Sequence, residues 1–126
     1  MRLNPTLEVF TELARSHRIV PVWSEVVADT LTPVAAFLHV VGDGPGFLLE
    51  SVEGGERWGR YSFVGRAPLA RMVARGREVT GTGRLPVPTG NGDGVLAALE
   101  ELLDVYQLPR LEHLPPMYAG VVGYLG

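Results

Sequence analysis

Apolar residues recur at intervals of three and four in three stretches of the chain, which is the spacing of one face of an α-helix. The first stretch follows Asn4-Pro5 and carries Leu7 and Phe10. An Asn side chain can accept hydrogen bonds from the free N–H groups of a first helical turn, and Pro fits the first helical position. We therefore predict a helix that starts at Asn4-Pro5 and ends at the polar residues 15–18.

The second and third stretches carry further helix signals. Thr32-Pro33 repeats the cap-and-proline pattern ahead of residues 34–41, where apolar residues return at helical spacing. The third stretch, 95–106, is the clearest. Its apolar positions form one predicted stripe: Val95, Leu96, Leu99, Leu102, Leu103 and Tyr106. Acidic residues occupy the remaining face, so we predict an amphipathic helix whose stripe faces the core.

Short runs rich in β-branched and aromatic residues lie between the helices and are typical of strands. We predict strands over residues 19–27, 47–52 and 60–65, and a hairpin of 69–73 with 77–82 that turns near Gly76. The order of helix, strand, helix, several strands and helix is typical of an α+β fold with a largely antiparallel sheet and about three helices.

The last ten residues, Met117–Gly126, are apolar, uncharged and strand-like. A strand with an unpaired apolar edge invites pairing with another chain. We therefore expect the chain to have continued past this segment. Where the natural neighbours of Tyr118–Leu125 are missing, we predict self-association through it.

Composition and charge narrow the class of protein. The 126 residues suit one domain, and 46% of them are hydrophobic. The net charge is −3, from 11 basic and 14 acidic residues, and no basic cluster favours a nucleic-acid partner. No apolar run approaches the roughly 20 residues of a membrane span, and no apolar core of a signal peptide follows Met1. We expect a soluble, cytoplasmic protein with no membrane partner.

Metal and nucleophile chemistry have little support in the sequence. There is no Cys, and His17, His39 and His113 lie far apart without carboxylates at ligand spacing. Residues 90–94 precede a helix and are rich in Gly, but they lack the Lys of a phosphate-binding loop and include Asp93. We expect no catalytic residue, metal or other cofactor in this chain.

Glu50 and Ser51 interrupt an otherwise apolar strand. In a regular strand they would point to opposite faces, so one of them would meet a polar partner. One interpretation is a strand end that enters a loop. The other is a site for an amino acid, because an ammonium group pairs with a carboxylate and a carboxylate pairs with a hydroxyl or an Arg. Arg60 would return beside this strand if Gly54-Gly55 makes the turn.

Several of these residues together resemble a known family. They are Pro21-Val22-Trp23, Asp29 to Val34, Leu48-Leu49-Glu50-Ser51, Glu53 to Arg57, Gly59 to Gly65, and Gly120 to Gly126. In this order they resemble the amino-terminal region of anthranilate synthase component I, a chorismate-utilising enzyme. The resemblance covers roughly residues 20–68 and the tail.

The resemblance implies a function for the whole protein. The family converts chorismate and ammonia, supplied from glutamine by a partner amidotransferase subunit, to anthranilate and pyruvate in tryptophan biosynthesis. It implies magnesium in a carboxy-terminal catalytic domain that this chain lacks. Residues 1–126 would then be an amino-terminal regulatory domain and an incomplete portion of a larger two-layer chorismate-binding-type fold.

The resemblance also implies a site for L-tryptophan as feedback inhibitor. Glu50 and Ser51 would contact the polar head of the amino acid, Leu49 would pack nearby, and Arg60 would assist. No catalytic or metal-binding residue carries over.

Two alternatives stay open. One is the amino-terminal domain of aminodeoxychorismate synthase component I, the sister enzyme. The other is a stand-alone small-molecule binding module without catalysis.

Overall fold

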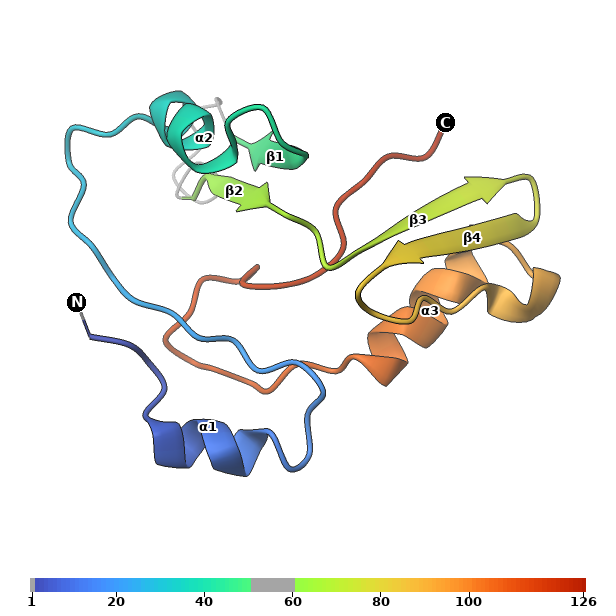
Figure 1. The fold of residues 1–126 in the computed structure, drawn as a ribbon, viewed down its shortest axis with the longest axis horizontal. Coiled ribbons are helices and arrows are strands. Elements are labelled where there is room, and N and C mark those ends of the chain that lie inside the picture. The colour runs from blue at the N-terminus through green and yellow to red at the C-terminus, as the bar shows by residue number, and fades with distance from the viewer. Residues whose placement is uncertain (1, 51–60) are drawn as a thin grey trace. The chain divides into compact units, whose positions relative to one another are not determined.

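A computed structural model describes residues 2–50 and 61–126. In these residues the elements follow the order α1 (Leu7–Leu13), α2 (Pro33–Val41), β1 (Gly46–Leu49), β2 (Phe63–Arg66), β3 (Ala70–Arg75), β4 (Glu78–Gly83), η1 (Gly90–Gly92) and α3 (Val95–Val105) (Figure 1). β1 pairs with β2 and β3 pairs with β4, both antiparallel. The predicted α+β class with three helices and antiparallel pairing is confirmed.

The chain divides into two compact units. One combines the described residues up to Glu25 with Leu69–Leu111, and so contains α1, β3, β4, η1 and α3. The other combines the described part of Val26–Pro68 with Glu112–Gly126, and so contains α2, β1 and β2.

In the second unit, α2 packs against both strands of the β1–β2 hairpin (Figure 1). The predicted start of α2 is confirmed. The Thr32 hydroxyl accepts a hydrogen bond from the Ala35 N–H at 3.2 Å, and Pro33 opens the helix. Val41, at the end of α2, is 7% exposed. A Cβ added to Gly46 would lie only 2.5 Å from Cγ1 of Val41, so the end of α2 packs closely against the start of β1.

In the first unit, α3 and η1 pack against β4. The hairpin turn at Gly76 is confirmed, with φ of 61° at that residue. Val79 on β4 is 5% exposed and Ala98 on α3 is fully buried. The Tyr106 hydroxyl donates a hydrogen bond to the Pro86 carbonyl at 2.8 Å, which ties the end of α3 to the loop after β4.

The inward face of α3 differs from the predicted stripe. Leu96 is 69% exposed and Leu103 is 57% exposed, so neither belongs to the core. The helix packs instead through the buried Ala98, and its backbone approaches Gly90 so closely that a Cβ on Gly90 would lie 2.8 Å from the Ala98 nitrogen.

Two predictions near the amino terminus are wrong. α1 begins at Leu7 with Thr6 as its cap, two residues later than predicted, because the backbone of Asn4 pairs with Trp23 instead. Both hydrogen bonds of this bridge measure 2.8 Å. The bridge is also the only strand-like pairing within residues 19–27, so the strand predicted there is absent: one paired position does not make a ladder.

Two further strand predictions need correction. β1 ends at Leu49 and β2 begins at Phe63, because the ladder stops at the pair that these two residues form. Glu50 therefore follows the strand and does not lie within it. The tail residues 118–125 form no strand among the described residues. Side chains of Val121, Tyr124 and Leu125 there are 50%, 95% and 72% exposed, since no neighbouring strand accompanies them.

Few apolar side chains are buried among the described residues. The buried residues there are Val41, Val79, Gly90, Ala98 and Pro109, whereas many large apolar side chains are exposed. In the described part of the chain, no helix has the length and apolar character needed to cross a membrane.

Candidate functional site

The predicted site lies at the end of β1. Leu49 is the last residue of that strand, pairs with Phe63 and is 42% exposed. Glu50 follows and is exposed. Ser51 and Arg60 lie outside the described residues, so the predicted approach of Arg60 to Glu50 stays a prediction.

The pairing register divides the hairpin into two faces, because side chains alternate along each strand. Gly46, Leu48 and Val64 share the face that meets α2, as the contact of Gly46 with the Val41 side chain shows. Phe47, Leu49, Phe63 and Gly65 share the other face. We call these last four residues the open face of the hairpin.

The open face is apolar and closely fitted. The Phe47 ring packs against Gly65 and fills the space that a Cβ at position 65 would need. Near Leu49, the rings of Tyr61 and Phe63 have centroids 6.1 Å apart and planes tilted by 36°. This distance is in the range of favourable aromatic pairs. The open face thus offers apolar and aromatic surface at the end of the hairpin where Glu50 lies.

Glu50 follows Leu49 in the chain and adds a negative charge at this end of the hairpin. Within residues 2–50 and 61–126, its carboxylate makes no hydrogen bond or ion pair. An unpaired carboxylate can accept hydrogen bonds from an ammonium group, and apolar surface beside it can hold a side chain. The arrangement can therefore bind a cation that carries an apolar group.

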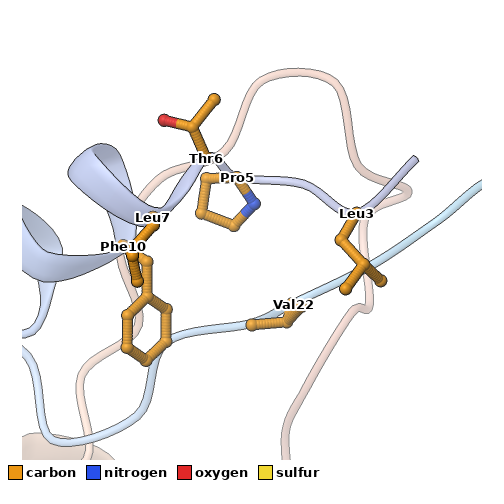
Figure 2. Close-up of a pocket in the computed structure, with 6 residues that line it drawn as sticks. All are labelled: Leu3, Pro5, Thr6, Leu7, Phe10 and Val22. Carbon is orange, nitrogen blue, oxygen red and sulfur yellow. The ribbon is translucent and has the colours of Figure 1, made fainter.

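Away from the predicted site, a groove lies at the start of α1 (Figure 2). Its lining is almost entirely apolar: Leu3, Pro5, Thr6, Leu7, Phe10 and Val22. Figure 2 shows the Phe10 ring and Val22 directed toward the same space from α1 and from the extended segment, while the Thr6 hydroxyl points away. That hydroxyl accepts the Val9 N–H at 3.4 Å. None of the described residues that line this groove is charged, so these residues cannot neutralise the charged head of an amino acid.

The described residues also bear on metal binding. No three His, Asp or Glu side chains gather within the part of the chain that the structure describes. Because a divalent cation needs several such ligands, we assign no described residue to magnesium.

Sequence reasoning missed the aromatic residues of the open face. Phe47 lies two residues before Leu49 in β1 and Phe63 pairs with it across the strands, yet the sequence prediction named only Leu49, Glu50, Ser51 and Arg60. A usable signal was present, because a large residue in one strand and a glycine in the next favour a cross-strand fit.

Comparison with known proteins supplies independent information. No family model matches the chain. Three similar proteins are each named "Anthranilate synthase component 1". The one from Mycolicibacterium smegmatis is 37% identical over 118 residues, which is 93% of this chain and 22% of the relative. The one from Synechocystis is 41% identical over 128 residues, 98% of this chain and 25% of the relative. The one from Aquifex aeolicus is 34% identical over 127 residues, which is again 98% of this chain and 25% of the relative.

These matches confirm the resemblance seen in the sequence. They extend it from residues 20–68 and the tail to nearly the whole chain. The chain spans about a quarter of the length of the curated relatives it matches.

Proposed function

We propose that this chain, which matches anthranilate synthase component 1 over nearly its whole length, is the amino-terminal regulatory domain of such an enzyme. The single observation that carries the proposal is the identity of 34–41% to relatives of that name. The whole protein would convert chorismate and ammonia to anthranilate and pyruvate. A glutamine amidotransferase subunit would supply the ammonia, and magnesium would bind outside this chain.

The regulatory ligand in this proposal is L-tryptophan, bound at the Glu50 end of the β1–β2 hairpin. The exposed Glu50 carboxylate would accept the ammonium group, and Ser51 and Arg60 would receive the ligand carboxylate. Leu49 and Phe63 would contact the indole ring. What supports this assignment is that the Glu50 carboxylate has no partner among the described residues and that Leu49, at the same end of the hairpin, is 42% exposed.

The test is inhibition of the full-length enzyme by tryptophan, followed through anthranilate fluorescence. Ser51→Phe should leave the uninhibited rate unchanged and raise the tryptophan concentration for half-inhibition more than about tenfold. An aromatic ring would fill the ligand's space and would remove a hydrogen bond worth about 1–3 kcal/mol. Ser16→Phe, the same change at an exposed position of the other unit, is the control. Unchanged inhibition of Ser51→Phe would refute the site.

The two alternatives are separated by other measurements. Aminodeoxychorismate synthase would release a different product from chorismate and glutamine, which chromatography identifies. A stand-alone module would bind tryptophan tightly as the isolated chain. Calorimetry of the 126-residue chain with tryptophan should show weak binding or none, whereas submicromolar binding would favour the module.

Self-association through Tyr118–Leu125 is part of the same proposal. Exposed apolar side chains in this tail, Tyr124 and Leu125 above all, would be covered in the longer protein. Sedimentation of the 126-residue chain should show a dimer or higher species that a Tyr124→Asp, Leu125→Asp variant loses. A monomer at all concentrations would refute this part.

A further inference from the structure

The loop ahead of α3 contains one of the two asparagines of the chain. These are Asn4 and Asn91, and the single glutamine is Gln107. Asn91 lies in η1 between Gly90 and Gly92, and its backbone is left-handed, with φ of 50° and ψ of 31°. Asn tolerates this conformation better than most residues that carry a side chain. The backbone of η1 therefore explains why an Asn is accepted at position 91.

The segment around Asn91 is open to water. Asn91, Gly92 and Asp93 are all exposed, and a Cβ added to Gly92 would meet nothing within 4 Å. The Asn91 side chain makes no hydrogen bond with any residue that the structure describes. The Asp93 N–H donates to the Gly90 carbonyl at 2.8 Å, and the exposed Asp93 carboxylate lies 3.9 Å from the Arg77 guanidinium. A local opening that breaks this hydrogen bond frees the backbone on either side of Gly92.

An Asn followed by Gly is thermolabile, because it can lose ammonia without an enzyme. The Gly92 backbone nitrogen attacks Cγ of Asn91, the bond from Cγ to Nδ2 breaks, and Nδ2 leaves as ammonia with the proton of the Gly92 N–H. Water then opens the cyclic imide. Where water breaks the bond between the Gly92 nitrogen and Cγ, the product is Asp. Where it breaks the bond to the backbone carbonyl carbon of residue 91, the chain continues through the side chain as isoaspartate. Gly92 favours the attack, because it has no Cβ to shield its nitrogen and its backbone rotates freely.

We propose that Asn91 is a site of spontaneous deamidation, and that its isoaspartyl product loosens the packing of η1 on α3. Gly90, the preceding residue, is buried, and a Cβ on it would lie 2.8 Å from the Ala98 nitrogen. An isoaspartyl linkage adds a methylene group to the backbone directly after Gly90. A closely packed contact cannot take up an added methylene without a shift of the backbone. The inference rests on this loop and does not depend on the proposed function.

Intact mass spectrometry of the 126-residue chain tests the site. Incubation at mildly alkaline pH should raise the mass by the difference between an OH and an NH2 group. Asn91→Gly is the matched control, because Gly also accepts a positive φ, and its mass should stay constant. Asn4 cannot react in this way, because Pro5 has no N–H. Asp43 and Asp93 also precede glycines, but their isomerisation leaves the mass unchanged.

A synthetic peptide of residues 86–97 gives the rate without the fold. The folded chain should react more slowly than this peptide by about tenfold or less, because one exposed hydrogen bond has to open. Peptide mapping should place isoaspartate at position 91. The isoaspartyl chain, separated by chromatography, should have a lower urea midpoint than the Asn91→Asp variant. That variant has the same charge and an unaltered backbone, so the comparison isolates the added methylene group.

Three results would overturn the inference. If the mass of the folded chain stays constant while the peptide reacts, the fold protects Asn91. A mass gain that persists in Asn91→Gly would place the reaction elsewhere in the chain. Equal urea midpoints for the isoaspartyl chain and for Asn91→Asp would show that η1 accommodates the longer backbone, so its packing on α3 would not be loosened.

Discussion

The two hairpins of this chain fix their registers by different means. β3 and β4 pair over six positions, and only Gly76 and Arg77 separate the strands. Such a short connection determines which residues face each other. β1 and β2 pair over four positions, and residues 50–62 lie between them. A connection of that length leaves the register free.

Packing fixes the register of β1–β2 instead. The Phe47 ring lies over Gly65 in the opposite strand, and Val41 of α2 lies over Gly46. A shift by one residue would place a side chain under the Phe47 ring and would also exchange the two faces of the hairpin. A local turn therefore specifies one hairpin, whereas contacts with a ring and a helix specify the other. Substitutions should distinguish the two mechanisms.

The largest effect is expected for Gly83→Ala in the β3–β4 hairpin. Gly83 has φ of 127°, and a Cβ there would lie 2.5 Å from the Ala70 Cα and 2.6 Å from the Leu69 carbonyl oxygen. Backbone atoms cannot move aside as a side chain can. We expect a loss of about 3 kcal/mol in the free energy of unfolding, measured by urea denaturation. Gly123→Ala, where the added Cβ meets nothing within 4 Å, is the control. A Gly83→Ala variant as stable as this control would refute the close approach.

Gly65→Ala tests packing control of the β1–β2 hairpin. The new methyl group would overlap the Phe47 ring, so we expect a loss of about 1–3 kcal/mol. Because the obstacle is one side chain, Phe47→Leu should recover part of this loss when combined with Gly65→Ala. A double-mutant cycle of urea midpoints measures the coupling. Strictly additive losses would show that Phe47 does not determine the register.

The same contrast between local interactions and tertiary packing separates the features that could be predicted from the sequence from those that could not. The start of α2 at Thr32-Pro33 and the turn at Gly76 depend on neighbouring residues, and both were predicted correctly. The strands over 19–27 and 118–125 were wrong, because β-rich composition does not supply a partner strand. The inward face of α3 was partly wrong, because Leu96 and Leu103 are exposed and the buried residue is Ala98, where the helix backbone closely approaches Gly90.

In the candidate site, too, local features could be predicted from the sequence and features that depend on packing could not. Leu49 and Glu50 are both exposed, and their role in binding a ligand stays a prediction. The open face around Phe47 and Phe63 could not be found from single residues, because it depends on the register of two strands whose connection does not fix it. Ser51 and Arg60 remain predictions from the resemblance.

A smaller effect is expected for the caps of the helices that cover the hairpins. α2 has a side-chain cap, the Thr32 hydroxyl, whereas α3 starts at Gly94 without one. Thr32→Ala should lower the free energy of unfolding by about 1 kcal/mol. Thr32→Ser should keep most of the wild-type stability, because a Ser hydroxyl can also accept a hydrogen bond from the Ala35 N–H. The exposed Thr30, changed to Ala, is the control. Equal urea midpoints for Thr32→Ala and Thr30→Ala would show that packing on β1 and β2 alone holds α2.

The smallest effect concerns α1, which buries no residue and so depends most on local interactions. A hydrogen bond from its own backbone N–H, and secondly one from Thr6, lowers the pKa of Glu8 below its ordinary value. A lowered pKa in the folded chain means that the charged carboxylate stabilises α1 above the unfolded pKa. This stabilisation is lost as the pH falls through the folded pKa. Carboxyl carbon shifts measured by NMR should give Glu8 a lower midpoint in the folded chain than in urea, and Thr6→Ala should raise the folded value. Equal midpoints in the folded and unfolded chain would mean that the first turn of α1 does not hold the Glu8 carboxylate.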